Sequence, residues 1–497
     1  MRILNLDDFS RIINGDVLFD NWSRDIYSVD ASNYIIKPEL IMCPRDRYDV
    51  ENLCKYCFDK NISLTPRGAG TGLLGQSLSN NIVVDFTKYM NKILEIDSDY
   101  TIVEPGVVKG VLDKELKKKG KFLPPDPASS NYCTVGGMIA NNSSGAHSLG
   151  YGSTIDFLQE VGIVYYDGTF SQINEKSYAF DPLMIKLFKL LSPYLDIIQN
   201  QYPKVTKNSC GYRLDALFSK NKFSPQKIFA SSEGTLGLVT SSKMKIMDIP
   251  LYRHLLLLSF NNIFSAILQL PLILKFSPTA VELLDHTVIS NINKNSINDP
   301  LENFGCLLFV EFAEDKSGYI DKKVKLFKEK LIDKCNILES VSDEKSISQI
   351  WASRKGALNN VMKISDGSRK PIGLIEDTVV GNESLYDYVR FMIQSFADND
   401  LEYVIYGHAG DGNLHVRPII DTNSESQVKL MNSLAEQIFK KVIKLGGTIT
   451  GEHGDGLARV NYIPLMYGDK LYSIFEQVKS LLDPTLILNP GKKIIKS

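Results

Sequence analysis

Apolar and polar positions follow two different periods along this chain, which predicts a mixture of strands and helices. In the first half, short apolar runs predict strands at 62–65 and 82–86 and a helix that begins near Val108. After about residue 251 the runs become longer. There we expect strands at Leu255–Phe260, Ala280–Leu284 and Leu307–Phe312 and an amphipathic helix at Lys322–Lys334. These later elements predict an antiparallel sheet with helices on one face.

Two apolar runs, Leu401–Tyr406 and Leu414–Ile420, flank a glycine-rich turn and predict a β-hairpin. His408 and His415 stand at the two ends of the turn, so we expect their side chains to face one another across its mouth. A helix is expected next, because Thr422-x-x-Glu425 has the form of a capping box. Its apolar stripe ends at Gly446-Gly447 and consists of Leu430, Leu434, Ile438 and Val442.

Composition limits the class of protein. The chain has 497 residues, enough for two or three domains, and its net charge of −2 gives no reason to expect a nucleic acid partner. Its most apolar long stretch, Leu255–Leu274, contains Asn261, Asn262 and Pro271, so we expect a buried strand and a buried helix there and no transmembrane segment.

The expected location is cytoplasmic. Asp7 and Asp8 interrupt the apolar core that a secretory signal needs, and the seven cysteines form no framework. A peripheral position at the inner face of the membrane is the alternative.

Two local patterns have both a reactive and a structural interpretation. Cys54 and Cys57 have the spacing of a redox or zinc pair, but both lie on the apolar face of one predicted helix, which favours core packing. Lys117-Lys118-Lys119 closes another helical pattern just before Gly120, and we expect it to be a solvated helix end.

Three loops are rich in glycine and in small hydroxyl residues, at 66–75, 124–145 and 231–239. Gly70–Gly75 matches the G-x-G-x-x-G dinucleotide motif, but that motif must open a helix, whereas this loop leads into the predicted strand at 82–86. The Rossmann interpretation therefore fails. What remains is backbone with few Cβ atoms, which can bring N–H groups to an anion. Three such loops predict a large ligand held along its length.

Three of the six histidines lie in two turns rich in glycine and aspartate, which favours a metal site over isolated loop histidines. His408 and His415 alone make an incomplete ligand set, since a divalent metal usually takes a third protein ligand. The turn at 451–456 offers Glu452 or His453 for that position. Asp411 and Asp455 are weaker candidates, because aspartate in a glycine-rich turn usually bonds its own backbone.

Six short motifs, which follow one another along the chain, together resemble those of a known enzyme family. They are Pro-Arg-Gly-x-Gly-Thr-Gly from Pro66, Pro-Asp-Pro-Ala-Ser from Pro125, Val-Gly-Gly from Val135, Glu-Gly-Thr-Leu-Gly from Glu233, Gly-His-x-Gly-Asp-Gly-Asn-x-His from Gly407 and Gly-Glu-His-Gly from Gly451. Together they resemble the FAD-dependent D-2-hydroxy acid dehydrogenases of the vanillyl-alcohol oxidase superfamily. The resemblance runs from about residue 30 to Lys492.

The resemblance implies an α+β protein. It places a two-subdomain FAD-binding domain at 1–250 and a cap domain, with an antiparallel sheet and helices on one face, at 251–440. A segment at 441–497 is expected to complete the active site and return to the FAD domain.

The same motifs imply which residues bind FAD. They are Pro66, Arg67, Gly68, Ala69, Gly70, Thr71, Gly72, Asp126, Ser129, Thr134, Gly136, Gly137, Asn141, Ser144, Gly145, Glu233, Gly234, Val239 and Asn489. Non-covalent FAD is expected, because His147 and Cys133, the local candidates for a tether, lie outside the glycine run of the first loop.

Oxidation of a 2-hydroxy acid requires loss of the hydroxyl proton and transfer of a hydride from C2 to flavin N5. Chemistry and resemblance agree on His408, His415 and Glu452 as ligands of a divalent metal, with zinc expected and manganese, cobalt or ferrous iron as alternatives. His453 is the expected general base, since an unperturbed imidazole pKa of about 6.5 suits that task at neutral pH.

Two arginines are candidates for the substrate carboxylate. Arg417 lies two residues past His415 on the same predicted strand, so both side chains should point to the same face. Arg354 stands at a position where relatives carry a substrate-binding arginine. The structural alternatives are a surface arginine at a strand edge and an exposed helix charge.

These expectations describe a dehydrogenase of a D-2-hydroxy acid, with D-lactate or D-2-hydroxyglutarate favoured and glycolate as a further alternative. The chain has no iron–sulfur motif, so electrons should leave to an external acceptor: a quinone, an electron-transfer flavoprotein or an iron–sulfur protein. The alternatives are an oxygen-using flavin oxidase or synthase, which the metal hairpin disfavours, and a catalytically silent FAD-binding subunit, which the intact histidines disfavour.

Overall fold

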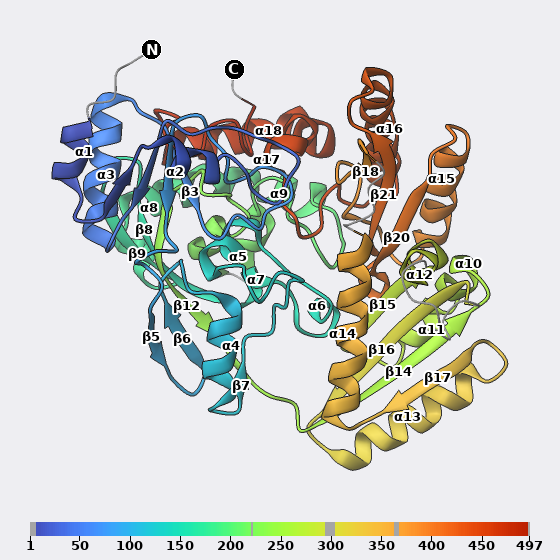
Figure 1. Ribbon diagram of the computed structural model, residues 1–497. Coiled ribbons are helices and arrows are strands. Elements are labelled where there is room, and N and C mark those ends of the chain that lie inside the picture. The colour runs from blue at the N-terminus through green and yellow to red at the C-terminus, as the bar shows by residue number, and fades with distance from the viewer. Residues whose placement is uncertain (1–5, 220–221, 294–303, 362–366, 496–497) are drawn as a thin grey trace.

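The computed structural model describes residues 6–219, 222–293, 304–361 and 367–495 of the chain. Figure 1 shows two halves side by side: an N-terminal half in blue to green, and a second half in yellow-green to orange that is built on a larger sheet. The last helix, in red, lies on the N-terminal half.

The first sheet of the N-terminal half has the order β1-β2-β4-β3. β2 (Leu40–Cys43), β4 (Ile82–Asp85) and β3 (Leu64–Arg67) are parallel, and β1 (Asp16–Leu18) pairs antiparallel at the edge. The loop from β3 to β4 contains no helix within its described residues, which confirms that the glycine motif is not of the Rossmann type.

α3 (Arg47–Lys60) joins β2 to β3 and buries one apolar face. Cys54 and Cys57 are fully buried on that face together with Val50 and Leu53. The core-packing interpretation of the cysteine pair is therefore confirmed.

The second sheet is antiparallel with the order β5-β6-β12-β8-β9. Its strands are β5 (Ile93–Ile96), β6 (Tyr100–Val103), β12 (Leu238–Lys245), β8 (Leu158–Val164) and β9 (Phe170–Ile173). α4 (Lys109–Lys117) packs Leu112 and Leu116 into the core. The lysines from 117 to 119 are exposed at its end, as expected.

The larger sheet of the second half has the order β17-β14-β16-β15-β20-β21-β18, with β19 also paired to β21. Its pairs are antiparallel throughout. The strands are β14 (Tyr252–Phe260), β15 (Ala280–Asp285), β16 (Cys306–Glu314), β17 (Asn336–Val341), β18 (Arg369–Pro371), β19 (Thr378–Val379), β20 (Tyr403–His408) and β21 (Asn413–Asp421). The predicted strands and the predicted hairpin are confirmed.

Helices cover both faces of this sheet, so the expectation of helices on one face was wrong. Leu256 and Leu258 of β14 face the core shared with α10 (Ile263–Ile267), α11 (Leu270–Leu274), α13 (Ser317–Leu331) and α15 (Leu385–Ala397). Leu255 and Leu257 face a separate core with α12 (His286–Asn293) and α14 (Glu344–Val361). The central strands are apolar on both faces because both are covered. α14 lies across the sheet on the side toward the N-terminal half (Figure 1).

α16 (Glu425–Lys444) follows the hairpin, and its cap differs from the predicted one. Ser424, not Thr422, is the N-cap, and its hydroxyl accepts a hydrogen bond from the backbone N–H of Gln427. Thr422 instead donates its hydroxyl to the backbone oxygen of Ser368. The helix ends before Gly446, which has a φ of +73°.

The C-terminal segment returns to the N-terminal half through α17 (Gly456–Arg459) and α18 (Ile463–Leu482). Leu488 forms a parallel bridge to Leu64 beside the first sheet. Asn489 then donates its side-chain N–H groups to the backbone oxygens of Gln76 and Glu233. The mixed α+β fold and the returning C-terminal segment are as expected.

The remaining helices and strands are short or peripheral. They are α1 (Leu6–Ile12), α2 (Asn21–Ile26), β7 (Lys121–Phe122), α5 (Val135–Asn141), α6 (Ser148–Tyr151), α7 (Thr154–Phe157), α8 (Pro182–Leu191), α9 (Leu195–Gln201), β10 (Phe218–Ser219), β11 (Lys222–Phe223) and β13 (Met247–Asp248). Among the described helices, none combines the length and the apolar character needed to cross a bilayer.

Candidate active site

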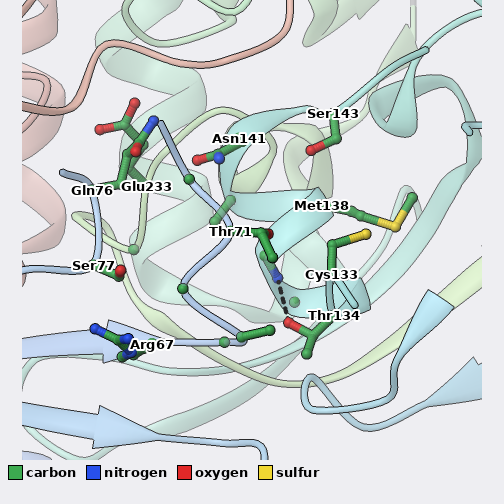
Figure 2. A pocket seen from close by; sticks show the side chains of 18 of the residues that line it. Arg67, Thr71, Gln76, Ser77, Cys133, Thr134, Met138, Asn141, Ser143 and Glu233 are labelled. Atoms are coloured by element: carbon green, nitrogen blue, oxygen red, sulfur yellow. Dashed lines mark hydrogen bonds between the residues drawn. The ribbon is translucent and has the colours of Figure 1, made fainter. Parts of the chain in front are cut away.

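The three small-residue loops converge on one cavity of about 490 Å³. Figure 2 shows side chains from all three around it, including Arg67 and Thr71 of the first loop, Thr134 and Asn141 of the second and Glu233 of the third. A cavity of this volume lined by three separate loops suits one large ligand.

Most of the residues predicted to bind FAD line this cavity. They are Pro66, Arg67, Gly68, Ala69, Gly70, Thr71, Gly72, Ser129, Thr134, Gly136, Gly137, Asn141, Ser144, Glu233, Gly234 and Val239. The other three lie elsewhere: Asp126 and Gly145 line a neighbouring cavity, and Asn489 supports the loops from behind through Gln76 and Glu233. The motif-based prediction did not mark further lining residues, among them Gln76, Ser77, Tyr132, Met138 and Phe229.

Two glycines explain why the loops can approach so closely. A Cβ on Gly68 would lie 2.2 Å from Oγ1 of Thr134, and one on Gly234 would lie 2.2 Å from Cγ of Pro66. Gly234 also has a φ of +69°, in the left-handed region that glycine adopts without strain. The first loop is therefore held against both other loops at positions that exclude a side chain.

A cluster of three histidines lies beside this cavity, with Glu452 at its centre. Nε2 of His408 lies 3.1 Å from Oε1 of Glu452. Nε2 of His415 lies 3.4 Å from the same oxygen, and Nε2 of His453 lies 3.5 Å from it. The hairpin supplies His408 and His415, whose ring centroids are 5.2 Å apart. The turn after α16 supplies Glu452 and His453.

Each imidazole is fixed on its other side by a buried carboxylate. Nδ1 of His408 lies 2.5 Å from Oε1 of Glu282 on β15. Glu376 holds two rings: its Oε2 lies 2.8 Å from Nδ1 of His415, and its Oε1 lies 2.6 Å from Nδ1 of His453. This pattern leaves every Nε2 directed toward Glu452, as in the carboxylate–histidine–metal arrangements of metalloproteins.

The second oxygen of Glu452 has other partners. Ser144 donates its hydroxyl to Oε2 at 2.9 Å, and Nζ of Lys207 lies 3.3 Å from it. Lys207 is fully buried and also contacts Asp411 at 3.6 Å. Asp455 contacts Lys493 at 2.7 Å. Both aspartates that were weaker ligand candidates thus pair with lysines.

These contacts keep buried carboxylates ionised. Burial raises the pKa of Glu452, but Lys207 and His408 outweigh it and hold that pKa well below its usual range. Burial likewise opposes ionisation of Glu376, while His453 and Arg417 hold its pKa well below the usual range. Each imidazole therefore has an ionised carboxylate on both sides, Glu452 at Nε2 and Glu282 or Glu376 at Nδ1.

The same contacts raise the pKa values of two of the histidines. Burial alone would lower the pKa of His453, but Glu376 and Asp377 raise it to about 9. The pKa of His408 is raised to about 9 as well, against burial, by Glu282. The expectation of an unperturbed pKa for His453 was therefore wrong, because the buried carboxylates were not visible in the sequence. A divalent cation near these rings would oppose the shift.

The donor set fits a divalent metal. Asp377, His415, Glu452 and His453 each offer a ligand atom within 4.8 Å of the others. Asp377, however, already accepts the backbone N–H groups of Gly451, Glu452 and His453. We therefore assign Asp377 to support of the turn and regard the three Nε2 atoms and Glu452 as the available donors.

A second cavity, of about 540 Å³, adjoins the first. Glu452 and His453 line both cavities. The second is also lined by His408, His415, Tyr406 and His147 and by one face of α14, with Ile347, Ser348, Trp351 and Lys355. A ligand in it would contact the histidine cluster on one side and α14 on the other.

Arg354 and Arg417 both line this second cavity and are buried. Arg354 forms an ion pair with Glu282, and Nη2 of Arg417 lies 3.5 Å from Oε2 of Glu376. Neither is an exposed surface charge, so both structural alternatives for them are excluded. Each arginine also contacts a carboxylate that anchors a histidine.

Sequence reasoning missed Glu282, Glu376 and Asp377. One signal was present, since Glu282 is a lone acid inside the apolar run Ala280–Leu284, and a buried charge usually has a partner. Lys207 was missed as well, because the acids that it pairs with, Asp411 and Glu452, lie more than 200 residues away.

Two family models match this chain. A family model described as "FAD binding domain" matches residues 38–174, and one described as "FAD linked oxidases, C-terminal domain" matches residues 249–493. The chain is 31% identical to D-2-hydroxyglutarate dehydrogenase of Haemophilus influenzae over 98% of its own length. It covers 51% of that relative and so spans about half of its length.

A second relative matches along nearly its whole length. The chain is 29% identical to glycolate oxidase subunit GlcD of Bacillus subtilis, covering 97% of this chain and 95% of that one. Among solved structures, 4-ethylphenol oxidase from Gulosibacter chungangensis superposes with a TM-score of 0.72 over 98% of this chain and 96% of that chain. At 15% identity, that likeness concerns the fold alone.

Proposed function

The chain belongs to the FAD-linked oxidases, and from that premise we propose that it is a FAD- and metal-dependent dehydrogenase that oxidises a D-2-hydroxy acid to the 2-oxo acid. One observation carries the proposal. The imidazole cluster around Glu452 lies between a cavity lined by the three FAD-type loops and a second cavity of substrate size, and Glu452 and His453 line both.

The side chains around Glu452 suggest a separate chemical role for FAD, for the metal and for His453. Bound FAD would supply the hydride acceptor, and a divalent metal held by His408, His415 and Glu452 would acidify the substrate hydroxyl. His453 is assigned as the proton acceptor, since its Nε2 is the remaining imidazole nitrogen directed at Glu452. Zinc is the proposed metal, because two imidazoles and one carboxylate with an open position form a common catalytic zinc site.

The substrate carboxylate is assigned to Arg354 and Arg417. Both guanidinium groups line the second cavity beside the histidines. Each is already oriented by an anchoring carboxylate, which lowers the entropic cost of holding it in place.

Within the D-2-hydroxy acids we favour a dicarboxylate over lactate. A cavity of about 540 Å³ is larger than a three-carbon acid needs, and Lys355 lines its α14 wall. The charge of Lys355 acts on Asp113, but Asp113 already pairs with Lys109 at 2.5 Å, so we assign Lys355 to a distal carboxylate.

FAD is proposed to be bound without a covalent bond. Both ring nitrogens of His147 are engaged, Nδ1 with Asp126 at 2.6 Å and Nε2 with Glu311 at 3.2 Å. Burial raises the pKa of the Cys133 thiol, which makes it a poor nucleophile. The electron acceptor is proposed to be external, as a quinone, an electron-transfer flavoprotein or an iron–sulfur protein.

A substrate panel tests the proposal. The purified, FAD-loaded protein is mixed anaerobically with D-lactate, D-2-hydroxyglutarate and glycolate, each with its L-isomer where one exists, and flavin absorbance is followed. We expect bleaching by a D-acid, fastest with the dicarboxylate, and no bleaching by L-acids. A flavin that no hydroxy acid reduces would refute the proposed function.

A further inference from the structure

One carboxylate holds two imidazoles of the cluster. The two oxygens of Glu376 lie 2.8 Å from Nδ1 of His415 and 2.6 Å from Nδ1 of His453. The two rings are nearly parallel, with centroids 5.0 Å apart and an interplanar angle of 18°. Glu376 itself is fully buried.

The chemistry of Glu376 restricts the protons on both rings. An ionised carboxylate only accepts hydrogen bonds, so Nδ1 of each ring must carry the proton of its bond. A neutral imidazole with a proton on Nδ1 has its lone pair on Nε2. The Nε2 atoms, which would carry these lone pairs in the neutral rings, lie 3.4 Å (His415) and 3.5 Å (His453) from Oε1 of Glu452.

The neighbouring residue fixes the backbone of the same turn. Asp377 accepts the N–H of His453 at 2.9 Å and that of Glu452 at 3.1 Å. Arg459 is also fully buried and donates to the backbone oxygen of Glu376 and to the hydroxyl of Thr450. The Glu376-Asp377 pair therefore fixes both the side chains and the main chain at the centre of the site.

We propose that Glu376 is a positioning residue that sets the tautomer and orientation of His415 and His453 together, so that the metal ligand and the proton acceptor depend on one carboxylate. The metal and proton roles in this statement rest on the proposed function. The hydrogen-bond geometry of Glu376 does not.

Glu282 provides a matched comparison. It is also fully buried, but it anchors only His408, at 2.5 Å, and shares its other oxygen with Arg354. Glu376→Gln and Glu282→Gln each remove one buried negative charge next to the cluster. In Glu376→Gln, two imidazoles that each donated to a carboxylate oxygen must share one amide. That amide has a single acceptor oxygen, and its nitrogen is a donor.

The test uses the FAD- and zinc-loaded protein labelled with ¹⁵N-histidine, without substrate. Because the chain has only six histidines, their ring nitrogens can be assigned and their tautomers read by NMR. In the wild type we expect a proton on Nδ1 of both His415 and His453. A ring protonated at Nε2 but not at Nδ1 would overturn the proposal, and this measurement does not depend on any variant folding.

In Glu376→Gln the amide can accept from only one of the two rings. We expect either that His453 changes to the tautomer protonated at Nε2, or that zinc affinity, measured by competition with a chromogenic chelator, falls about 10- to 100-fold. In Glu282→Gln we expect the tautomers of His415 and His453 to stay unchanged. An unchanged His453 tautomer together with zinc affinity within twofold of wild type in Glu376→Gln would overturn the proposal.

Neither readout requires turnover. A wild-type protein that oxidises no hydroxy acid would refute the proposed function and leave the tautomer result standing. An active enzyme with the wrong tautomers would refute only the role of Glu376.

Discussion

Glu452 uses its two carboxylate oxygens for different partners. Oε1 faces the three imidazoles, whereas Oε2 accepts from Ser144 and lies 3.3 Å from Nζ of Lys207. Lys207 thus balances two buried acids, since it also pairs with Asp411. Removing that cation would leave both carboxylates buried without their common partner.

Lys207→Met should therefore be strongly destabilising. Breaking a buried ion pair by removing one partner costs about 3–5 kcal/mol. Lys118→Met is the matched control, because Lys118 forms only an exposed pair with Glu115, worth at most about 1 kcal/mol. Urea unfolding of both variants measures the difference. A Lys207 variant as stable as the Lys118 variant would show that Lys207 does not balance the site.

Lys355 is the residue proposed to bind the distal carboxylate and so to favour a dicarboxylate over D-lactate. Lys355→Met should raise KM for a D-2-hydroxy dicarboxylate roughly tenfold, equivalent to ~1.4 kcal/mol, and leave KM for D-lactate within about twofold. Steady-state kinetics with both acids measure this. Equal effects on the two substrates would remove Lys355 as the residue that recognises the distal carboxylate.

At the scale of elements, the β20–β21 hairpin positions two of the metal donors. Gly412 lies in its turn with a φ of +66°, and a Cβ there would lie 1.9 Å from the backbone oxygen of Val380. Gly446, after α16, also has a positive φ, +73°, but a Cβ there meets nothing within 4 Å. Comparing an alanine substitution at each glycine therefore distinguishes the effect of backbone strain from that of a steric clash.

Gly446→Ala should cost only the left-handed strain of a non-glycine residue, about 1–2 kcal/mol, with normal metal content. Gly412→Ala should displace the hairpin turn and lower the zinc bound per FAD as well as the stability. Elemental analysis and thermal unfolding of the two purified variants check this. If both variants retain the same zinc, the turn does not determine the position of the ligands.

Several elements were predictable because their signals are local. The hairpin, the long strands and the helix at Ser317–Leu331 follow from periodicity and turn residues, and the three glycine-rich loops follow from their composition. The metal donors were visible because two glycine-rich turns contain them. Signals of this kind need no knowledge of the tertiary fold.

What could not be predicted depends on contacts between distant segments. Glu282 is 126 residues from His408, and Glu376 is 77 residues from His453, so no spacing rule relates them. The second helical layer was missed although the continuous apolar run of β14 indicates a strand covered on both faces, because the sequence does not show which helices lie on which face. The cap of α16 was missed because Ser424 and Thr422 are both acceptable N-caps, and the tertiary contact of Thr422 decides between them.

At the scale of the whole molecule, a charged network joins the two halves. His147 of the N-terminal half contacts Asp126 in the same half and Glu311 on β16 of the second half. Arg253 and the indole N–H of Trp351 also bind Glu311. Burial would lower the pKa of His147, but Asp126 and Glu311 raise it to about 10.

This shift predicts a pH-dependent stability. Because the folded pKa of His147 lies above its unfolded value of about 6.5, its contribution is complete below pH 6.5 and is lost as the pH rises through 10. The wild type should lose up to about 1.4 kcal/mol per pH unit across that window relative to His147→Gln. Urea unfolding of both proteins at a series of pH values measures this, and a pH-independent difference would contradict it.

The proposed chemistry depends on a metal bound by the cluster around Glu452, and removing that metal tests this dependence most directly. The rate of anaerobic flavin reduction by the best D-2-hydroxy acid is measured for the metal-loaded protein, after chelation, and after zinc is restored, with His453→Ala in parallel. We predict a loss of at least about 100-fold on chelation, recovery with zinc, and a similar loss in His453→Ala with FAD and zinc retained. Reduction at an unchanged rate without metal, or in His453→Ala, would contradict the proposed chemistry.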